Sequence, residues 1–179
     1  MTAIDSVERN ARDTQGARPA LLRVDGLATQ IESRGRQLRA VDTVSFDIHH
    51  GEILGLVGES GCGKSMTALS IMRLLPPATS IASGSIRFGD RELTTLSNRE
   101  MRSIRGREIS MVFQEPMTAL DPAFTIGTQL TETIRAHEQV SKGEARTRAI
   151  AMLDRLGIAN AASRIDDYPH QFSGGMRQR

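Results

Sequence analysis

Eight consecutive residues, Gly58–Ser65, have the types and the spacing of a phosphate-binding loop. They fit the pattern G-x-x-x-x-G-K-S/T, in which glycines let successive backbone amides turn toward one phosphate group. Lys64 can bring a full positive charge to the β- and γ-phosphates, and the Ser65 hydroxyl can bind Mg²⁺. The pattern predicts that a nucleotide is bound by eight residues: Gly58, Glu59, Ser60, Gly61, Cys62, Gly63, Lys64 and Ser65.

The residues on either side of this P-loop have the patterns of the elements that must position it. Residues 53–57 (ILGLV) are a short apolar run, which is typical of a buried strand. Residues 66–75 carry apolar side chains at helical spacing, and Pro76 and Pro77 should end that helix. The sequence thus predicts a strand, a loop and a helix whose N-terminus adds partial positive charge at the phosphates.

The composition is that of an ordinary globular domain. The 179 residues are 39% hydrophobic and 25% charged, with a formal net charge of +2, which gives no argument for a nucleic-acid partner. No apolar run approaches the ~18 residues that a membrane span needs. Residues 1–20 predict a disordered tail without the pattern of a signal peptide. Because Cys62 is the single cysteine, we expect no disulfide and a reducing compartment.

The rest of the chain alternates between strand and helix patterns. A capping box at residues 141–144 should begin a helix that Gly157 closes. Further strands are expected from residue 21, at 41–48, at 84–88 and at 109–113, and further helices at 98–105 and 126–137.

Three motifs in this order resemble an ABC-type ATPase. After the P-loop comes Gln114, at the end of the expected 109–113 strand, and then Ser173-Gly174-Gly175. The chain from Leu21 onward is similar to the ATP-binding subunits of oligopeptide, dipeptide and nickel importers. The stretches that carry this similarity are VGESG at 57–61, VFQEPMTALDP at 112–122 and YPHQFSGGMRQR at 168–179.

The resemblance implies an α/β fold with a P-loop core and an antiparallel β portion at about residues 21–121, followed by a helical subdomain at about 122–179. It implies ATP and Mg²⁺ as cofactors, with Gln114 positioning the attacking water and sharing the metal ion with Ser65. Ile31 would lie on the adenine side. Ser173, Gly174 and Gly175 would contact the ATP held by the opposite subunit of a head-to-tail dimer.

The resemblance also implies partners and a location. The partners are a second ATP-binding subunit, integral membrane permease subunits and, indirectly, a periplasmic binding protein, and no nucleic acid is expected. The location is the cytoplasmic face of the bacterial inner membrane. The loop from Gln114 to about Phe124 would contact the permease, with Met117, Leu120 and Phe124 as exposed apolar contacts. The alternative is that these three side chains pack under the helical subdomain.

Two departures from the family pattern stand out. Ile31 occupies a position where family members usually place an aromatic ring on the adenine. The sequence given also reaches Arg179 before the family's apolar strand with Asp-Glu and its switch histidine. We therefore expect a C-terminally incomplete domain that does not hydrolyse ATP by itself, with residues 53–57 as an unpaired edge and residues 173–179 frayed.

Three other interpretations stay open at this point. The chain could be a truncated, non-enzymatic remnant that at most binds nucleotide. It could also belong to a nickel importer, or be a soluble ABC ATPase without a transport role. The peptide-importer wording around Gln114 and Ser173 argues against the last of these.

Overall fold

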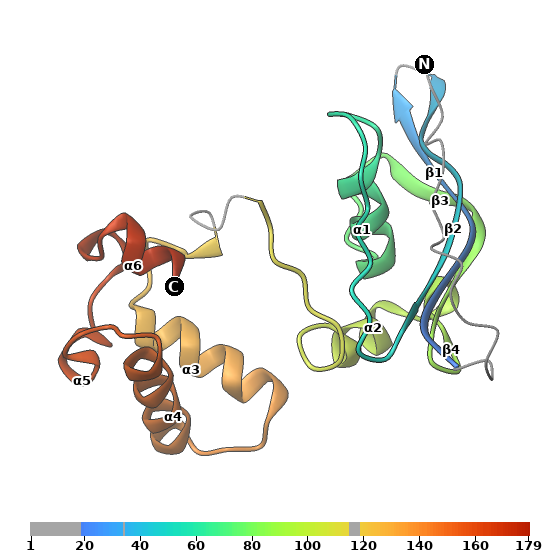
Figure 1. Ribbon diagram of the computed structural model, residues 1–179. Helices are drawn as coiled ribbons and strands as arrows, with labels where there is room; N and C mark the ends of the chain where they lie inside the picture. The colour runs from blue at the N-terminus through green and yellow to red at the C-terminus, as the bar shows by residue number, and fades with distance from the viewer. Residues whose placement is uncertain (1–18, 34, 115–118) are drawn as a thin grey trace. The chain divides into compact units, whose positions relative to one another are not determined.

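The structure is a computed structural model that describes residues 19–33, 35–114 and 119–179. The chain divides into two compact units, the first ending at Ile109 and the second beginning at Ser110, and each is described by itself (Figure 1). Most of the tail expected at residues 1–20 lies outside the described residues. No helix within the described ranges is long and apolar enough to cross a membrane.

The first unit is built on an antiparallel sheet in the strand order β2-β1-β3-β4 (Figure 1). Cross-strand partners such as Val24 and Phe46 bring apolar side chains to one face, as alternation along each strand requires. The strands expected from residue 21, at 41–48 and at 84–88 are confirmed, and pairing extends them. The strands are β1 (Ala20–Ser33), β2 (Arg36–His49), β3 (Thr79–Phe88) and β4 (Arg91–Glu92).

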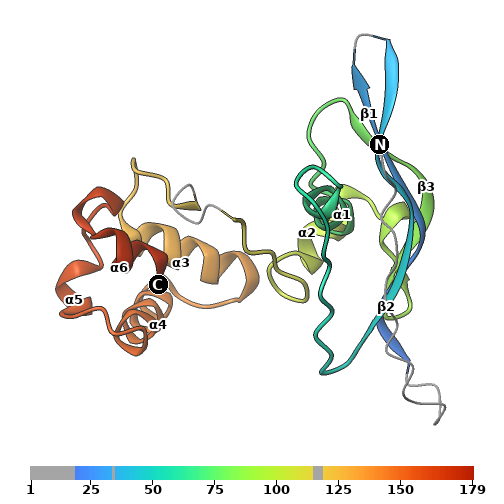
Figure 2. The same cartoon turned by 45° about the horizontal axis from the view of Figure 1, so that its top comes forward.

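Two helices and a 3-10 turn cover one face of this sheet: α1 (Lys64–Met72), η1 (Leu93–Thr95) and α2 (Asn98–Ile104) (Figure 2). The helix expected at 98–105 is confirmed, and it begins with a capping box of Ser97 and Glu100. The core between helices and sheet is apolar and buried, and it consists of Val24, Leu27, Val41, Val44, Phe46, Ile86, Leu93, Met101 and Ile104.

Helix α1 is shorter at its C-terminus than residues 66–75 predicted. It ends at Met72 because Arg73 adopts the left-handed conformation, with φ of 49°. The amides of Arg73 and Leu74 then turn back to the carbonyls of Ser70 and Leu69, at 3.0 and 2.9 Å. This arrangement satisfies carbonyl groups that the end of a helix leaves free, so the helix stops before the prolines.

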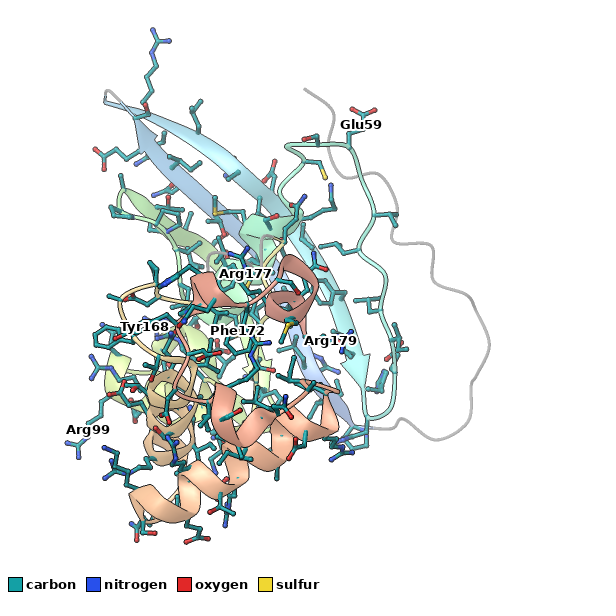
Figure 3. All side chains as sticks on the ribbon, turned by 90° about the vertical axis from the view of Figure 1, so that its left-hand side faces the viewer. Glu59, Arg99, Tyr168, Phe172, Arg177 and Arg179 are labelled. Atoms are coloured by element: carbon teal, nitrogen blue, oxygen red, sulfur yellow. The ribbon has the colours of Figure 1, made fainter. Side chains whose placement is uncertain are left out.

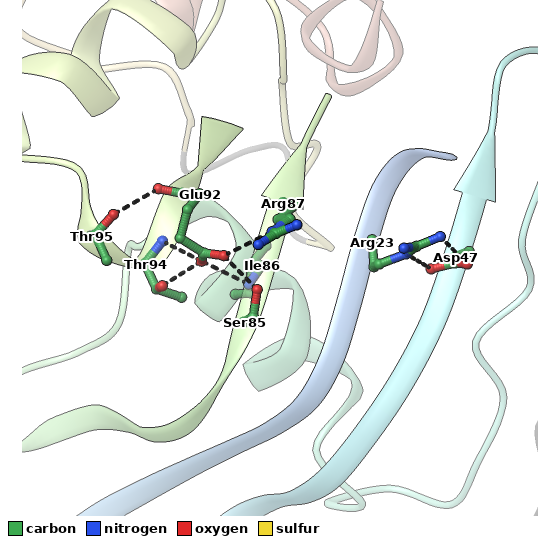
Figure 4. Close-up of polar contacts among 8 residues, drawn as sticks. All are labelled: Arg23, Asp47, Ser85, Ile86, Arg87, Glu92, Thr94 and Thr95. Atoms are coloured by element: carbon green, nitrogen blue, oxygen red, sulfur yellow. Dashed lines mark hydrogen bonds and ion pairs between the residues drawn. The ribbon is translucent and has the colours of Figure 1, made fainter. Parts of the chain in front are cut away.

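Glu92 ties β3, β4 and η1 together (Figure 4). Its carboxylate accepts hydrogen bonds from the Ser85 hydroxyl, from the Ile86 amide at 3.0 Å and from the amide and hydroxyl of Thr94. Burial raises the pKa of Glu92, but these hydrogen bonds outweigh burial and lower the pKa from 4.5 to about 2. The same figure shows the exposed ion pair of Arg23 with Asp47 across β1 and β2.

The strands predicted at residues 53–57 and 109–113 are wrong for this structure. Both segments lack strand hydrogen bonding, and Ile53 and Val57 are 97% and 80% exposed. A strand that is apolar on both faces needs a neighbouring strand on each side and a covering layer on each face. Within the described residues, neither segment finds these neighbours, so residues 53–57 are an irregular segment rather than the edge strand we expected.

The second unit is helical, as predicted, and the helix expected at 126–137 is confirmed. Its helices are α3 (Ile126–His137), α4 (Lys142–Arg155), α5 (Ala161–Arg164), η3 (Pro169–Gln171) and α6 (Gly174–Gln178) (Figure 1). They enclose a second apolar core of Ile126, Ala149, Leu153, Ile158, Ala161, Ile165 and Phe172.

The capping box predicted at residues 141–144 forms only in half. The Ser141 hydroxyl accepts a hydrogen bond from the Glu144 amide at 3.1 Å, which caps α4. The Glu144 carboxylate pairs instead with Arg148, one helical turn later, at 2.7 Å. Arg148 also pairs with Glu138, so the carboxylate joins an ion-pair network on the helix surface.

Candidate functional site

The P-loop lies between the irregular segment 53–57 and α1, and Lys64 bends back over it. Its ammonium group donates to the carbonyl oxygens of Gly58 at 2.8 Å and Glu59 at 2.7 Å, and lies 3.4 Å from the Cys62 sulfur. Figure 3 shows the Glu59 side chain at the outer end of the loop, directed away from it. The Lys64 ammonium therefore restrains the loop through these carbonyl contacts and places its positive charge inside the loop.

The C-terminal end of the loop is fixed against the sheet. Gly63 has φ of 100°, and a side chain there would collide with the backbone carbonyl oxygen of Ala40 in β2. The Thr67 amide and hydroxyl both donate to the Gly63 carbonyl, at 2.8 and 3.0 Å. Behind them, the buried hydroxyls of Ser70 and Thr29 are 2.8 Å apart and join α1 to β1.

This geometry suits an anionic ligand. The first amides of α1 have no partner inside the helix, and the helix dipole places partial positive charge at the same end. The Lys64 ammonium could exchange its two carbonyl contacts for phosphate oxygens, which bind it as stronger, charged acceptors. The Ser65 hydroxyl is exposed on the first turn of α1, where a divalent cation held by a phosphate could reach it.

Ile31 belongs to the sheet against which the P-loop helix α1 packs. It is half-buried in β1, paired with Leu38 in β2 and Thr79 in β3. The first unit contains two aromatic residues. Phe46 is in the core, and Phe88 lies beneath the Arg91 guanidinium. A base near Ile31 would therefore contact aliphatic side chains rather than a ring.

Gln114 belongs to the second unit and is exposed in an irregular segment. Met117 and the neighbouring Glu115 fall outside the described residues. Of the other two apolar residues expected to contact a permease, Leu120 packs against the helical core, whereas Phe124 is 52% exposed.

Gln129 shapes the loop that carries Phe124, and the sequence pattern did not single it out. Its side-chain oxygen accepts from the Asp121 amide, and its side-chain nitrogen donates to the carbonyls of Asp121 and Phe124, at 2.9 to 3.0 Å. A glutamine on the first turn of α3 just after a proline-flanked loop is the signal that could have indicated this role.

The Ser-Gly-Gly motif begins α6. The Ser173 hydroxyl accepts from the Met176 amide at 3.4 Å, and Gly174 and Gly175 have open space where a side chain would be. Phe172 is 5% exposed, with the Arg164 guanidinium 4.7 Å from its ring centre. Residues 174–178 are helical in the structure, and the fraying expected for 173–179 stays a prediction. Arg164 is a supporting residue that sequence reasoning missed.

The predicted site residues therefore divide between the two units. The first unit contains the P-loop and the strand that carries Ile31. The second unit carries Gln114 and the Ser173–Gly175 motif.

Residues 41–179 match the family described as ABC transporter. The chain belongs to this family. It is 49% identical over 160 residues to the dipeptide transport ATP-binding protein DppD of Bacillus subtilis (strain 168). The aligned region covers 89% of this chain and 48% of that protein. It is 43% identical over 160 residues to DppD of Escherichia coli (strain K12), with 89% and 49% covered. The chain thus spans about half the length of these curated relatives.

The ABC fold is confirmed by solved structures. The dimeric structure of a bacterial ABC transporter cassette superposes with a TM-score of 0.72 at 23% identity, covering 88% of this chain and 65% of that chain. A post-hydrolysis dimer with ADP and Pi superposes with a TM-score of 0.70, also at 23% identity. Together with the DppD relatives, these findings confirm the resemblance to ABC importer subunits that the motifs predicted.

Proposed function

We propose that this chain is an ATP-binding unit of an ABC importer, which couples ATP binding and hydrolysis to peptide uptake. The observation that carries the proposal is the P-loop at the start of α1, closed by Lys64 and fixed to the sheet through Gly63 and Ala40. The names of the DppD relatives, which are dipeptide transport ATP-binding proteins, support peptides as the substrate class.

Residues Gly58–Ser65 would hold the phosphates in this proposal, and Lys64 would bring its positive charge to the β- and γ-phosphates. ATP supplies the phosphoryl group, and Mg²⁺ bound with it neutralises charge on the phosphate oxygens. Ser65 and Gln114 are the residues of this chain that would hold the metal ion. Ile31 contacts the adenine side of the nucleotide and offers it apolar surface without stacking.

The other proposed contacts are made between subunits. Ser173, Gly174 and Gly175 contact the ATP of the opposite subunit, since the exposed glycines leave their amides accessible. Besides the opposite ATP-binding subunit, the proposed partners are permease subunits in the bacterial inner membrane. This unit binds them at the cytoplasmic face of that membrane. Phe124 is an exposed apolar residue in the described part of the contact loop.

Phosphate binding is tested by changing Lys64 to alanine and measuring ATP binding by calorimetry. Lys142, the other lysine of the chain, is exposed at the start of α4 and provides a matched control. Lys64→Ala should abolish binding because no other cation of the loop can take its place, whereas Lys142→Ala should bind normally. Equal affinities in the two variants, with folding checked by circular dichroism, would refute the P-loop assignment.

A polypeptide of residues 1–179 should bind ATP without turning it over at a useful rate. Phosphoryl transfer needs a positioned water and a fully held metal ion, and Ser65 and Gln114 provide only part of this machinery. Phosphate release in the presence of Mg²⁺ and ATP is the measurement. Turnover that disappears in Lys64→Ala would show that another acid, with Glu115 as the first candidate, activates the water.

The permease contact is tested by crosslinking from a cysteine at Phe124 to the cognate permease. A cysteine at Met152, which is 51% exposed on α4, is the control because both sites are equally accessible. Crosslinking should be several-fold stronger from position 124. Equal labelling from both positions would contradict docking through this loop.

The substrate class is tested in cells. Deletion of the gene should abolish uptake of a labelled dipeptide and leave nickel uptake unchanged. Loss of nickel uptake alone would favour the nickel importer, and loss of neither would favour an ABC ATPase without a role in transport.

A further inference from the structure

Two arginines surround the C-terminal end of the P-loop helix. Arg105 donates from Nε to the Met72 carbonyl at 2.8 Å and from Nη2 to the Arg73 carbonyl at 2.7 Å. Arg73 in turn donates to the carbonyls of Leu93, at 3.0 Å, and Leu96. The last carbonyls of a helix have no intrahelical partner, so the planar guanidinium of Arg105 occupies the place of the missing next turn.

Arg105 also stands where the chain leaves the first unit. It follows α2 directly, and the turn after it is closed by hydrogen bonds of Gly106 to Ile109 and of Ile109 to Ile104, at 2.8 and 3.2 Å. Ile109 packs against the sheet core, and Gln114 follows five residues later. One side chain therefore joins the end of the P-loop helix to the start of the segment that leads to Gln114.

The arrangement brings like charges together. Burial, and then the positive charges of Arg73 and Arg102, lower the pKa of Arg105. The hydrogen bonds to the two helix carbonyls, and the favourable field at the C-terminus of α1, offset this repulsion. A lysine could carry the charge, but it could not bind both carbonyls with a rigid, planar fork.

We propose that Arg105 is a positioning residue for the nucleotide site. Arg105 binds the last carbonyls of α1 and so restrains movement of this nine-residue helix along its axis. Because the P-loop adjoins the other end of the same helix, this restraint also sets the position of the P-loop. The alternative is that Arg105 only caps the helix and stabilises the unit without affecting the P-loop.

The first experiment rests on the proposed ATP binding. Arg105→Lys, Arg105→Met and the control Arg102→Met are compared by calorimetric ATP titration, at a temperature where all are folded. Arg102 is exposed on the same helix and is one of the charges near Arg105, so its removal controls for electrostatics. Both Arg105 variants should bind ATP about three- to thirtyfold more weakly, and Arg102→Met should bind normally. Unchanged affinity in both Arg105 variants would overturn the proposal.

The second experiment is independent of ATP. Amide hydrogen exchange is measured on the full chain without nucleotide, for the first turns of α1 and for the paired strands β1 and β2. In Arg105→Met, exchange should accelerate at Thr67, whose amide is bonded to the Gly63 carbonyl, and at the helical residues directly after it, and it should remain unchanged in the sheet. Equal acceleration in both regions would identify a general stabilising role and overturn the positioning role. If the unmodified chain binds no ATP, the function proposed above fails, and this exchange pattern still decides the role of Arg105.

Discussion

The segments that precede the two glycine motifs differ in burial. Residues 53–57, before the P-loop, form an apolar run that is irregular: Ile53 and Val57 are exposed, and Leu54 is only partly buried against the core of the first unit. The approach to the Ser-Gly-Gly motif contains Ile165 and Phe172, and both are buried in the helical core. The two segments therefore differ in the partners that the described chain offers them, and not in their hydrophobicity.

The helical unit supplies its own packing partners. The amides of Ile126 and Gly127 donate to the carbonyls of Asp167 and Ile165, at 3.0 and 2.7 Å. Gly127 is needed there, because a side chain would lie 2.8 Å from Ile165. These contacts close within residues 110–179, whereas a buried strand such as the one expected at 53–57 needs neighbouring strands that the described residues do not offer it.

The sharpest test of this comparison is Phe172→Ala, which should destabilise the helical unit by about 3–5 kcal/mol. The change leaves a cavity beneath the motif and removes the contact with Arg164. Tyr168→Ala is the control, because Tyr168 is an exposed aromatic residue of the same segment. Thermal unfolding of both variants is the measurement, and equal losses would show that the motif does not depend on this core.

Gly63→Ala should cost about 2–4 kcal/mol, because it combines a left-handed backbone with a collision against Ala40. ATP binding should weaken in parallel, since the loop must move away from β2. Gly55→Ala is the control, with ordinary φ and open space around its Cα. If both variants unfold and bind alike, the sheet does not hold the P-loop in place.

Glu92→Gln should destabilise the first unit by about 1–2 kcal/mol at neutral pH, because the acceptors of charged hydrogen bonds are replaced. The carboxylate has a lower pKa in the folded state than in the unfolded state, so its contribution is complete above pH 4.5. It is lost as pH falls from 4.5 toward about 2. Urea unfolding across this range should show the two proteins converging in acid, and a constant difference would contradict the role of Glu92.

Ile53→Ser should have the smallest effect, within about 0.5 kcal/mol, because the side chain is already 97% exposed. Val24→Ser in the neighbouring core provides the contrast, since Val24 is buried and a hydroxyl there would lack partners. Chemical unfolding of residues 1–179 measures both. A large loss in Ile53→Ser would show that residues 53–57 are packed in solution, and the comparison of the two segments would fail.

Local sequence patterns were sufficient for much of this molecule. Alternation predicted the strand at 41–48 within β2, the helix at 126–137 was predicted and is α3, and the motifs at Gly58–Ser65 and Ser173–Gly175 predicted the family. The patterns failed where a competing local interaction decides the outcome. The αL residue Arg73 ends α1 before the prolines, and Arg148 draws Glu144 out of its capping box.

The sequence by itself determined which residues can do chemistry, because the P-loop pattern is defined by residue type and spacing alone. Only the tertiary structure decided what holds those residues in place. Gly63 against Ala40 and Arg105 on the carbonyls of α1 join positions far apart in sequence. No local pattern predicts such contacts, since each depends on the whole chain bringing two surfaces together.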